Sequence, residues 1–155
     1  MEISDFLSPE SVIESLKARS KKQALQELAS RAEVLTSLPA REVFDVLLQR
    51  ERLGSTGVGL GVAIPHGKLT GASKVSAIFA RLDAPIEFES VDDEPVDLIF
   101  LLIAPSGAGA DHLKALARVS RLLRDPATLA KLRSSREPEV LYAILTESTA
   151  SHAAA

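Results

Sequence analysis

The sequence has 155 residues and contains no cysteine and no tryptophan, and only 4% of its residues are aromatic. Without cysteine the chain cannot form disulfides, a thiolate nucleophile or a thiolate metal site. It also lacks any apolar run near the roughly 20 residues that span a bilayer. The first residues, Met1–Asp5, lack the basic and apolar segments of a signal peptide. We therefore expect a cytoplasmic protein that does not insert into a membrane.

Positive charge is not in excess either, since the formal net charge is -3 and acidic and basic residues are interspersed. Nucleic-acid binding usually requires a basic face, so nucleic acid is not expected as the main ligand. Proteins and small anions remain as partners. A hydrophobic content of 46% in a chain of this length predicts one globular domain with a substantial core.

The hydrophobic pattern predicts helices, then strands, then helices again. A capping box at Ser20 and Gln23 opens the first helix, and Pro39 fits the first turn of the second. Two helices are expected over about 20–35 and 39–52, and three more are expected to begin at about 111, at 126 and at 138. Strands are expected over 62–64, 75–82, 86–91 and 96–103, and the last of these is expected in the middle of the sheet. The fold class is therefore α/β, a single-domain sandwich with a mixed β-sheet flanked by helices on both faces.

The pattern also predicts which side chains face the core and where the domain ends. The residues expected to face inward on the last helices are Leu113, Leu116, Ala117 and Leu123, then Leu129 and Leu132, then Val140, Leu141, Ile144 and Leu145. The domain is expected to cover residues 1–148. Residues 149–155 have no large apolar side chains to bury, so they are expected to form a disordered tail in which His152 has no functional role.

The most informative stretch runs from Glu51 to Lys68, where a glycine-rich loop leads into the apolar segment Val62-Ala63-Ile64 and then into Pro65 and His66. Proline has a fixed φ and no N–H for a ladder, so it should stop the strand. His66 is then expected at the end of a sheet, on the surface, with Gly67 leaving its approach uncrowded. We hypothesise that His66 is a nucleophile.

These residues also carry a resemblance. Glu51, followed by Val58-Gly59 and then by Val62-Ala63-Ile64-Pro65-His66-Gly67, resembles the active-site signature of the fructose/mannitol-type enzyme IIA proteins of the bacterial phosphoenolpyruvate:sugar phosphotransferase system. The amino-acid sequence of residues 61–68 is similar to that of the nitrogen-regulatory branch of the family. The resemblance implies the mannitol-type enzyme IIA fold. It also implies a carrier that accepts a phosphoryl group on His66 from an HPr-like phosphocarrier and regulates target proteins, such as potassium-transport or kinase proteins, by its phosphorylation state.

A histidine that accepts a phosphoryl group needs a neutral ring nitrogen and surrounding groups that stabilise the negative charge of the phosphoryl group. Transfer between two imidazoles is nearly thermoneutral, so no cofactor, metal or nucleotide is expected. The groups expected to line the phosphate are cations, backbone amides and hydroxyls: Arg50, Ser55, Thr56, Gly67 and Lys68. The resemblance implies that Arg50 contacts the phosphoryl group.

His112 is the expected second half of the site. It follows Asp111 in the first turn of a predicted helix, where amide N–H groups and the helix dipole favour an anion and disfavour an imidazolium. The resemblance implies that His112 is a helper histidine beside His66.

Other interpretations of the same residues remain open. Arg50 fits the last turn of a helix by its charge alone, and His112 could be a histidine satisfied locally at a helix start. A sugar-transport enzyme IIA would pass the group to an enzyme IIB, and a small metallohydrolase would use His66, His112 and Asp111 as ligands. The glycines before Lys68 do not match a P-loop, because the spacing is one residue too long and Leu69 stands where Ser or Thr is needed.

Overall fold

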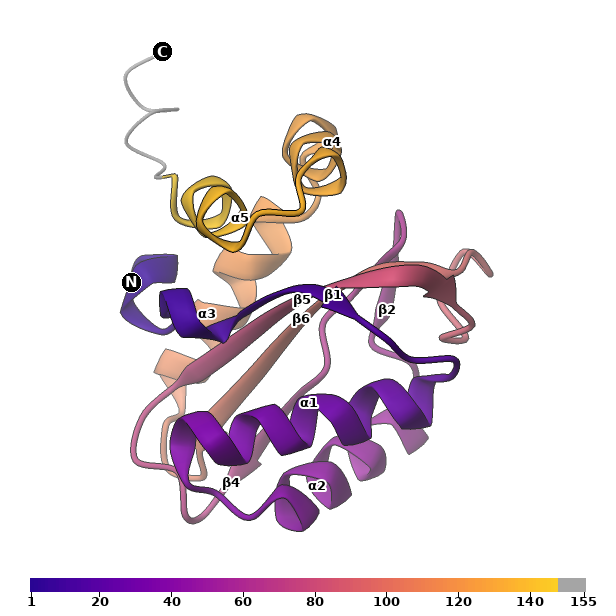
Figure 1. Ribbon diagram of the computed structural model, residues 1–155. Coiled ribbons are helices and arrows are strands. Elements are labelled where there is room, and N and C mark those ends of the chain that lie inside the picture. Colours follow the sequence, from indigo (N-terminus) through magenta and orange to yellow (C-terminus); the bar gives the residue numbers. More distant parts are fainter. Residues whose placement is uncertain (148–155) are drawn as a thin grey trace.

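The computed structural model describes residues 1–147. They form one mixed β-sheet with helices packed on both of its faces (Figure 1), which confirms the predicted α/β sandwich. The predicted tail, with His152, lies outside the described residues. Within the described residues no helix is long and apolar enough to cross a membrane.

Six strands make the sheet, in the order β1-β5-β6-β3-β2, and β4 also pairs with β6. β6 pairs antiparallel with β5 and parallel with β3 and β4, so it lies in the middle as predicted. The strands are β1 (Val12–Leu16), β2 (Gly57–Gly59), β3 (Val62–Ala63), β4 (His66–Leu69), β5 (Ser76–Ile86) and β6 (Val96–Pro105).

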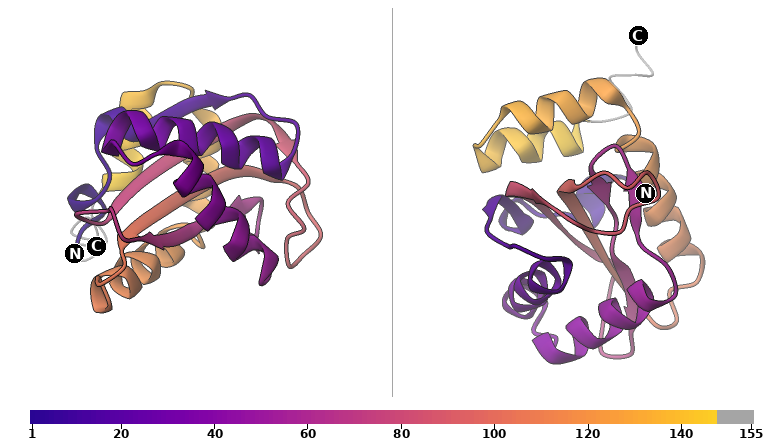
Figure 2. Two further views of the ribbon diagram at one scale, coloured as in Figure 1. Left: turned by 90° about the horizontal axis from the view of Figure 1, so that it is seen from below. Right: turned by 90° about the vertical axis from the view of Figure 1, so that its right-hand side faces the viewer.

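Within residues 1–147 five α-helices are present, and Figures 1 and 2 show helices on both faces of the sheet. One face is covered by α1 (Lys21–Thr36) and α2 (Ala40–Arg52). The other is covered by α3 (Ala110–Leu122), α4 (Pro126–Ser134) and α5 (Pro138–Thr146), together with the short 3-10 turns at Ile3–Asp5 and Pro9–Ser11.

The predicted start of α1 is confirmed, because Ser20 Oγ accepts a hydrogen bond from the Gln23 amide at 3.1 Å. The prediction of a separate strand over 86–91 is wrong. Phe88 and Ser90 are buried and their neighbours are exposed, which is the expected alternation. Glu89, however, has a φ of 56°, which no extended strand accommodates, so β5 ends at Ile86. β1 was not predicted.

The inward face of α3 differs from the prediction by about one position. His112, Ala115 and Val119 are buried, whereas Leu113 is 66% exposed and Ala117 is exposed. The sequence pattern placed the larger apolar side chains inside, but the helix turns its histidine toward the sheet instead. On α5, Leu141 and Leu145 are buried as predicted, whereas Val140 is 39% exposed and Ile144 is only partly buried.

Candidate functional site: a histidine pair at the edge of the sheet

The strand that carries His66 is interrupted at Pro65 and then continues. Val62 pairs with Leu98 and His66 pairs with Leu102, so β3 and β4 follow β6 with the same offset of 36 residues on both sides of the break. The prediction that His66 ends the sheet is therefore wrong. Pro65 cannot donate a hydrogen bond, but its carbonyl accepts one from the Leu102 amide at 2.9 Å, so the chain stays attached to β6.

The unchanged register decides which way His66 points. Side chains alternate along a strand, so His66 faces the same side as Val62 and Ile64, which pack into the core cluster under α3. Gly67 faces α2. A Cβ on Gly67 would lie 2.4 Å from Val46 Cγ1, so glycine allows α2 to approach β4 closely. The ring of His66 and the end of α2 thus meet at one edge of the sheet.

The imidazole of His66 is held in one tautomer. Its Nδ1 lies 2.8 Å from the carbonyl oxygen of Ile64, and since a carbonyl only accepts, Nδ1 carries the proton. The lone pair of the neutral ring is then on Nε2. His66 is partly buried and reaches the surface, where it was predicted to lie.

His112 lies beside His66, with the two ring centroids 5.7 Å apart and the ring planes tilted by 46°. His112 is only 6% exposed, and its Nδ1 has no hydrogen-bond partner in the described part of the chain. Burial lowers the pKa of His112, and the charges of His66 and Lys68 lower it further. The ring is therefore neutral near neutral pH, so it can donate a hydrogen bond without adding a full charge.

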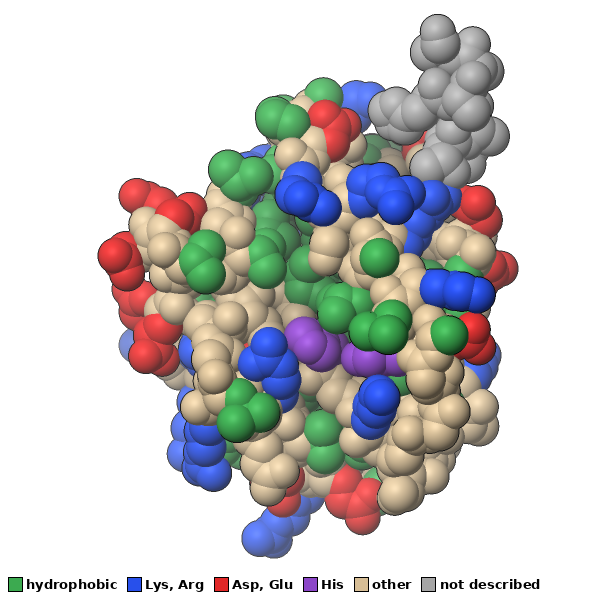
Figure 3. All heavy atoms as spheres, turned by 180° about the vertical axis from the view of Figure 1, so that it is seen from behind, with side chains coloured by type: hydrophobic (Ala, Val, Ile, Leu, Met, Phe, Trp, Pro, Cys, Tyr) green, Lys and Arg blue, Asp and Glu red, His purple; other side chains and the backbone are tan. Residues whose placement is uncertain are grey.

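The two histidines lie in an open depression of about 570 Å³, which we call the histidine depression. Figure 3 shows them side by side at the surface, with Lys and Arg side chains around them and most Asp and Glu side chains toward the edges of that face. The charged residues that line the depression are all basic: Arg50, Arg52 and Lys68. The site therefore suits an anion.

The residues predicted to line the phosphate do not all reach the histidine depression. Arg50 lines it, and its Nη1 also donates to the carbonyl of Gly54 at 2.8 Å, which ties the guanidinium to the end of α2. Gly67 and Lys68 line it as well. The hydroxyl of Ser55 instead donates to the carbonyl of Phe88 at 2.7 Å, and that of Thr56 to Glu51, so neither residue is among those lining it.

Glu51 belongs to the signature that carries the resemblance, but no role was predicted for it, and its partner Lys21 was not predicted at all. Lys21 Nζ lies 3.1 Å from a carboxylate oxygen of Glu51, whose side chain is only 3% exposed. One signal was present in the sequence, since an acidic residue in the last turn of a helix is disfavoured by the helix dipole and calls for a partner.

Two large apolar side chains are exposed beside the histidines. Leu53, which lines the depression, is 86% exposed, and Leu113, next to His112, is 66% exposed. These two leucines add exposed apolar surface beside the histidine pair.

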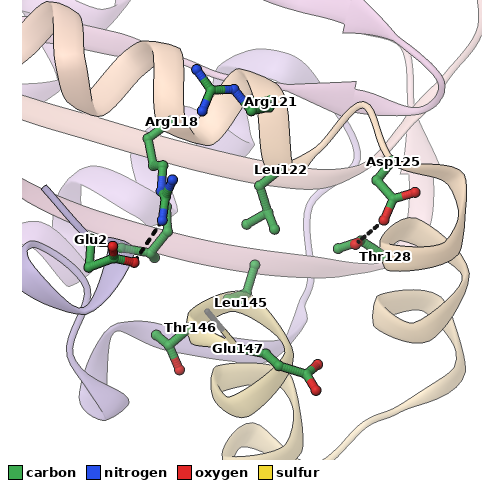
Figure 4. Close-up of a pocket in the computed structure, with 10 residues that line it drawn as sticks. Glu2, Arg118, Arg121, Leu122, Asp125, Thr128, Leu145, Thr146 and Glu147 are labelled. Atoms are coloured by element: carbon green, nitrogen blue, oxygen red, sulfur yellow. Dashed lines mark hydrogen bonds and ion pairs between the residues drawn. The ribbon is translucent and has the colours of Figure 1, made fainter. Parts of the chain in front are cut away.

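A second hollow, the helical pocket, lies between α3, α4, α5 and the first 3-10 turn and has a volume of about 360 Å³ (Figure 4). Ile3, Leu122 and Leu145 supply its apolar lining. At its edges Arg118 pairs with Glu2 at 2.7 Å, and Thr128 donates to Asp125 at 2.8 Å. It holds neither histidine of the pair.

No group of three or more His, Asp or Glu side chains among residues 1–147 is placed to hold a metal ion. Asp111, which the metallohydrolase interpretation needs as a third ligand, is exposed and is not among the residues that line the histidine depression. The geometry therefore gives the metallohydrolase interpretation no support.

The fold and the site together define a small α/β domain built around a pair of histidines at the edge of a mixed sheet. Comparison with known proteins identifies the family: residues 5–148 match the model for the phosphoenolpyruvate-dependent sugar phosphotransferase system, EIIA 2. The chain belongs to this phosphotransferase family, as the resemblance of residues 51–68 implied.

Relatives extend over nearly the whole chain. The nitrogen regulatory protein of Bradyrhizobium diazoefficiens is 61% identical over 145 residues, which cover 94% of this chain and 95% of that protein. The crystal structure of nitrogen regulatory protein IIA-Ntr from Neisseria meningitidis superposes with a TM-score of 0.88 at 35% identity, covering 93% of this chain and 99% of the other. Enzyme IIA for mannitol from Escherichia coli, solved in complex with phosphorylated enzyme IIB, shares the fold, with a TM-score of 0.76, 19% identity and coverage of 91% and 97%.

Proposed function

We propose that the protein is a phosphohistidine carrier of the nitrogen-related phosphotransferase system and that His66 Nε2 accepts the phosphoryl group. The observation that carries this proposal is the hydrogen bond from His66 Nδ1 to the Ile64 carbonyl at 2.8 Å. It leaves the lone pair on Nε2, so the ring is ready to attack without losing a proton.

The transfer balances without any further reactant. The Nε2 lone pair attacks phosphorus, the bond between phosphorus and the donor's ring nitrogen breaks, and its electron pair returns to that nitrogen. A donor ring protonated on its other nitrogen leaves as neutral imidazole. His66 keeps its Nδ1 proton, so the phosphorylated ring carries a positive charge beside the phosphoryl dianion. No metal or nucleotide enters the step.

The surroundings stabilise the transferred group by charge and by position. Arg50, Arg52 and Lys68 line the depression, and a guanidinium can bind two phosphoryl oxygens at once. His112 lies in the first turn of α3, where backbone amides and the helix dipole favour an anion. Because burial lowers its pKa, His112 acts as a neutral hydrogen-bond donor near neutral pH. Arg50 and His112 are therefore the proposed phosphoryl contact and helper.

The donor is a protein, because the reactive ring lies in an open depression with exposed leucines beside it. Leu53 and Leu113 offer apolar contact, and the basic residues around His66 suit the phosphoryl group that the donor brings. An HPr-like phosphocarrier is the proposed upstream partner, and both proteins act in the cytoplasm.

The relatives named nitrogen regulatory protein favour a regulatory role after phosphorylation. In this role the phosphorylation state selects among target proteins, such as potassium-transport or kinase proteins. The second candidate is a sugar-transport subunit that hands the group to an enzyme IIB. It is favoured by the likeness in fold to the mannitol enzyme IIA that was solved with its phosphorylated enzyme IIB.

Intact mass spectrometry after incubation with phosphoenolpyruvate and the upstream phosphotransferases tests the proposal. We expect the wild type to gain one phosphoryl group that is labile in acid and stable in base, and His66→Ala to gain none. His112→Gln serves as the matched control, since it removes the neighbouring imidazole and should still be phosphorylated, but more slowly. Phosphorylation of His66→Ala, or no phosphorylation of the wild type, would show that the proposal is wrong.

A further inference from the structure

Glu51 is the only Asp or Glu among the described residues that is classed as buried, with 8% of the residue exposed. Its carboxylate accepts hydrogen bonds from the Thr56 amide at 3.1 Å and from the Thr56 hydroxyl, and it pairs with Lys21 at 3.1 Å. A buried carboxylate is costly unless it is paired and hydrogen-bonded in this way. The bonds to Glu51 therefore hold Thr56 firmly at the end of α2.

Thr56 is in turn bonded to the segment that holds His66. Its carbonyl accepts a hydrogen bond from the Ile64 amide at 2.9 Å, and the Ile64 carbonyl accepts the bond from His66 Nδ1 at 2.8 Å. Three successive hydrogen-bonded links thus run from the buried carboxylate to the ring of His66.

Ile64 depends on this support because it lies in the break between β3 and β4. β3 ends at Ala63 and β4 begins at His66, so Ile64 is outside both strands that pair with β6. The direction of its carbonyl determines where the Nδ1 proton of His66 is held, and Thr56 bonds the amide of the same residue.

We propose that Glu51 is a positioning residue for His66, acting through Thr56 and Ile64; this inference rests on the proposed phosphocarrier function. Glu51 does not touch the phosphoryl group. It keeps the Ile64 carbonyl where it accepts from Nδ1, which keeps the lone pair on Nε2. When the link is broken, the ring also populates the tautomer protonated on Nε2, whose lone pair is on Nδ1, so Nε2 cannot attack phosphorus.

Nitrogen-15 NMR of the imidazole of His66 tests this directly, because the shifts of the two ring nitrogens report which one carries the proton. The test variant is Glu51→Gln. The matched control is Glu89→Gln. The carboxylate of Glu89 also lies near Lys21, with 3.3 Å between Oε1 and Nζ, but its side chain is 79% exposed and makes no bond to Thr56. We expect a single Nδ1–H tautomer in the wild type and in Glu89→Gln, and a mixture of tautomers in Glu51→Gln.

The transfer kinetics give a second readout. Hydrogen-bond partners that orient metal-bound histidines are typically worth 10- to 100-fold in activity, and on the same scale kcat of Glu51→Gln should fall roughly tenfold. KM for the phosphorylated donor should stay within about twofold, because Glu51 does not line the depression that the donor contacts. Thr56→Val should show the same defect by removing the hydroxyl, and Thr56→Ser, which keeps it, should restore both readouts. If Glu51→Gln does not fold, Thr56→Val decides the question.

If both Glu51→Gln and Thr56→Val keep the single Nδ1–H tautomer and the wild-type kcat, the positioning role is wrong. Failure of the proposed function gives a different result: the wild type then takes up no phosphoryl group from the donor. The tautomer measurement needs no donor, so it still tests the link from Glu51 to His66.

Discussion

The histidine depression and the helical pocket differ in almost every respect that matters for chemistry. The helical pocket is the smaller of the two, with an apolar lining, and several polar groups at its edges pair with one another, such as Arg118 with Glu2. The histidine depression is open, and the charged groups that line it are all basic. The proposed reactive histidine therefore does not lie in the apolar hollow, which is the kind of site that a small molecule usually occupies; this agrees with the proposal that the donor is a protein.

Replacing a leucine by alanine should destabilise the fold at the helical pocket and hardly change its stability at the histidine depression, and this is the largest expected difference. Leu145→Ala removes a buried side chain, 1% exposed, from the wall of the helical pocket and should lower the free energy of unfolding by about 3 kcal/mol. Leu53→Ala removes an exposed one and should change it by less than about 0.5 kcal/mol. Chemical denaturation measures both.

Phosphoryl transfer should reverse that ranking. Well below its melting temperature, Leu145→Ala should transfer at the wild-type rate, whereas Leu53→Ala should raise KM for the phosphorylated donor with kcat nearly unchanged. If Leu145→Ala impaired transfer while still folded, the separation between the two hollows would not hold.

A smaller effect is expected where α2 packs against β4. Gly67→Ala should destabilise the fold by about 2 kcal/mol, because the new Cβ would lie 2.4 Å from Val46 Cγ1 and force the wall of the histidine depression outward. The helical pocket should not change. The double variant with Val46→Ala makes room for the Cβ, so it should be more stable than Gly67→Ala alone; denaturation of the three variants measures this coupling. A double variant no more stable than the single one would place the strain elsewhere.

The smallest effect concerns pH and His112. Because the pKa of His112 is lowered in the folded state, the unfolded chain binds a proton first as the pH falls below about 6.5. Stability should therefore fall with decreasing pH, beginning near 6.5 and levelling off below the lowered pKa. His112→Gln should remove this part of the pH dependence, which urea unfolding at several pH values measures. An identical pH dependence in the variant would assign the effect to another group.

Much of the architecture follows from local signals in the sequence. The N-cap at Ser20 starts α1, as the sequence indicated. The nearly continuous apolar run of β6 correctly predicted the centre of the sheet, because a strand covered on both faces has no polar side to alternate. The pairing of β1 with β5 was not predictable in this way, since it joins segments more than 60 residues apart.

The site was less accessible to prediction than the fold. The motif around His66 indicated the candidate reactive residue, but the inward face of α3 was predicted about one position off, because apolar residues were assigned to the core ahead of a histidine. The hydroxyls of Ser55 and Thr56 were expected near the phosphate, yet tertiary contacts with Phe88 and Glu51 engage them. Such contacts depend on which segments meet in space, which spacing along the chain does not specify.

The equal offset of β3 and β4 along β6 restricts how this segment can change in evolution. Successive residues of a strand face opposite sides of the sheet. Inserting or deleting a single residue between Ala63 and His66 would therefore turn the imidazole toward α2 and turn Gly67 toward α3. We therefore expect length changes in this short span to occur only in steps of two residues, even where the residue identities vary.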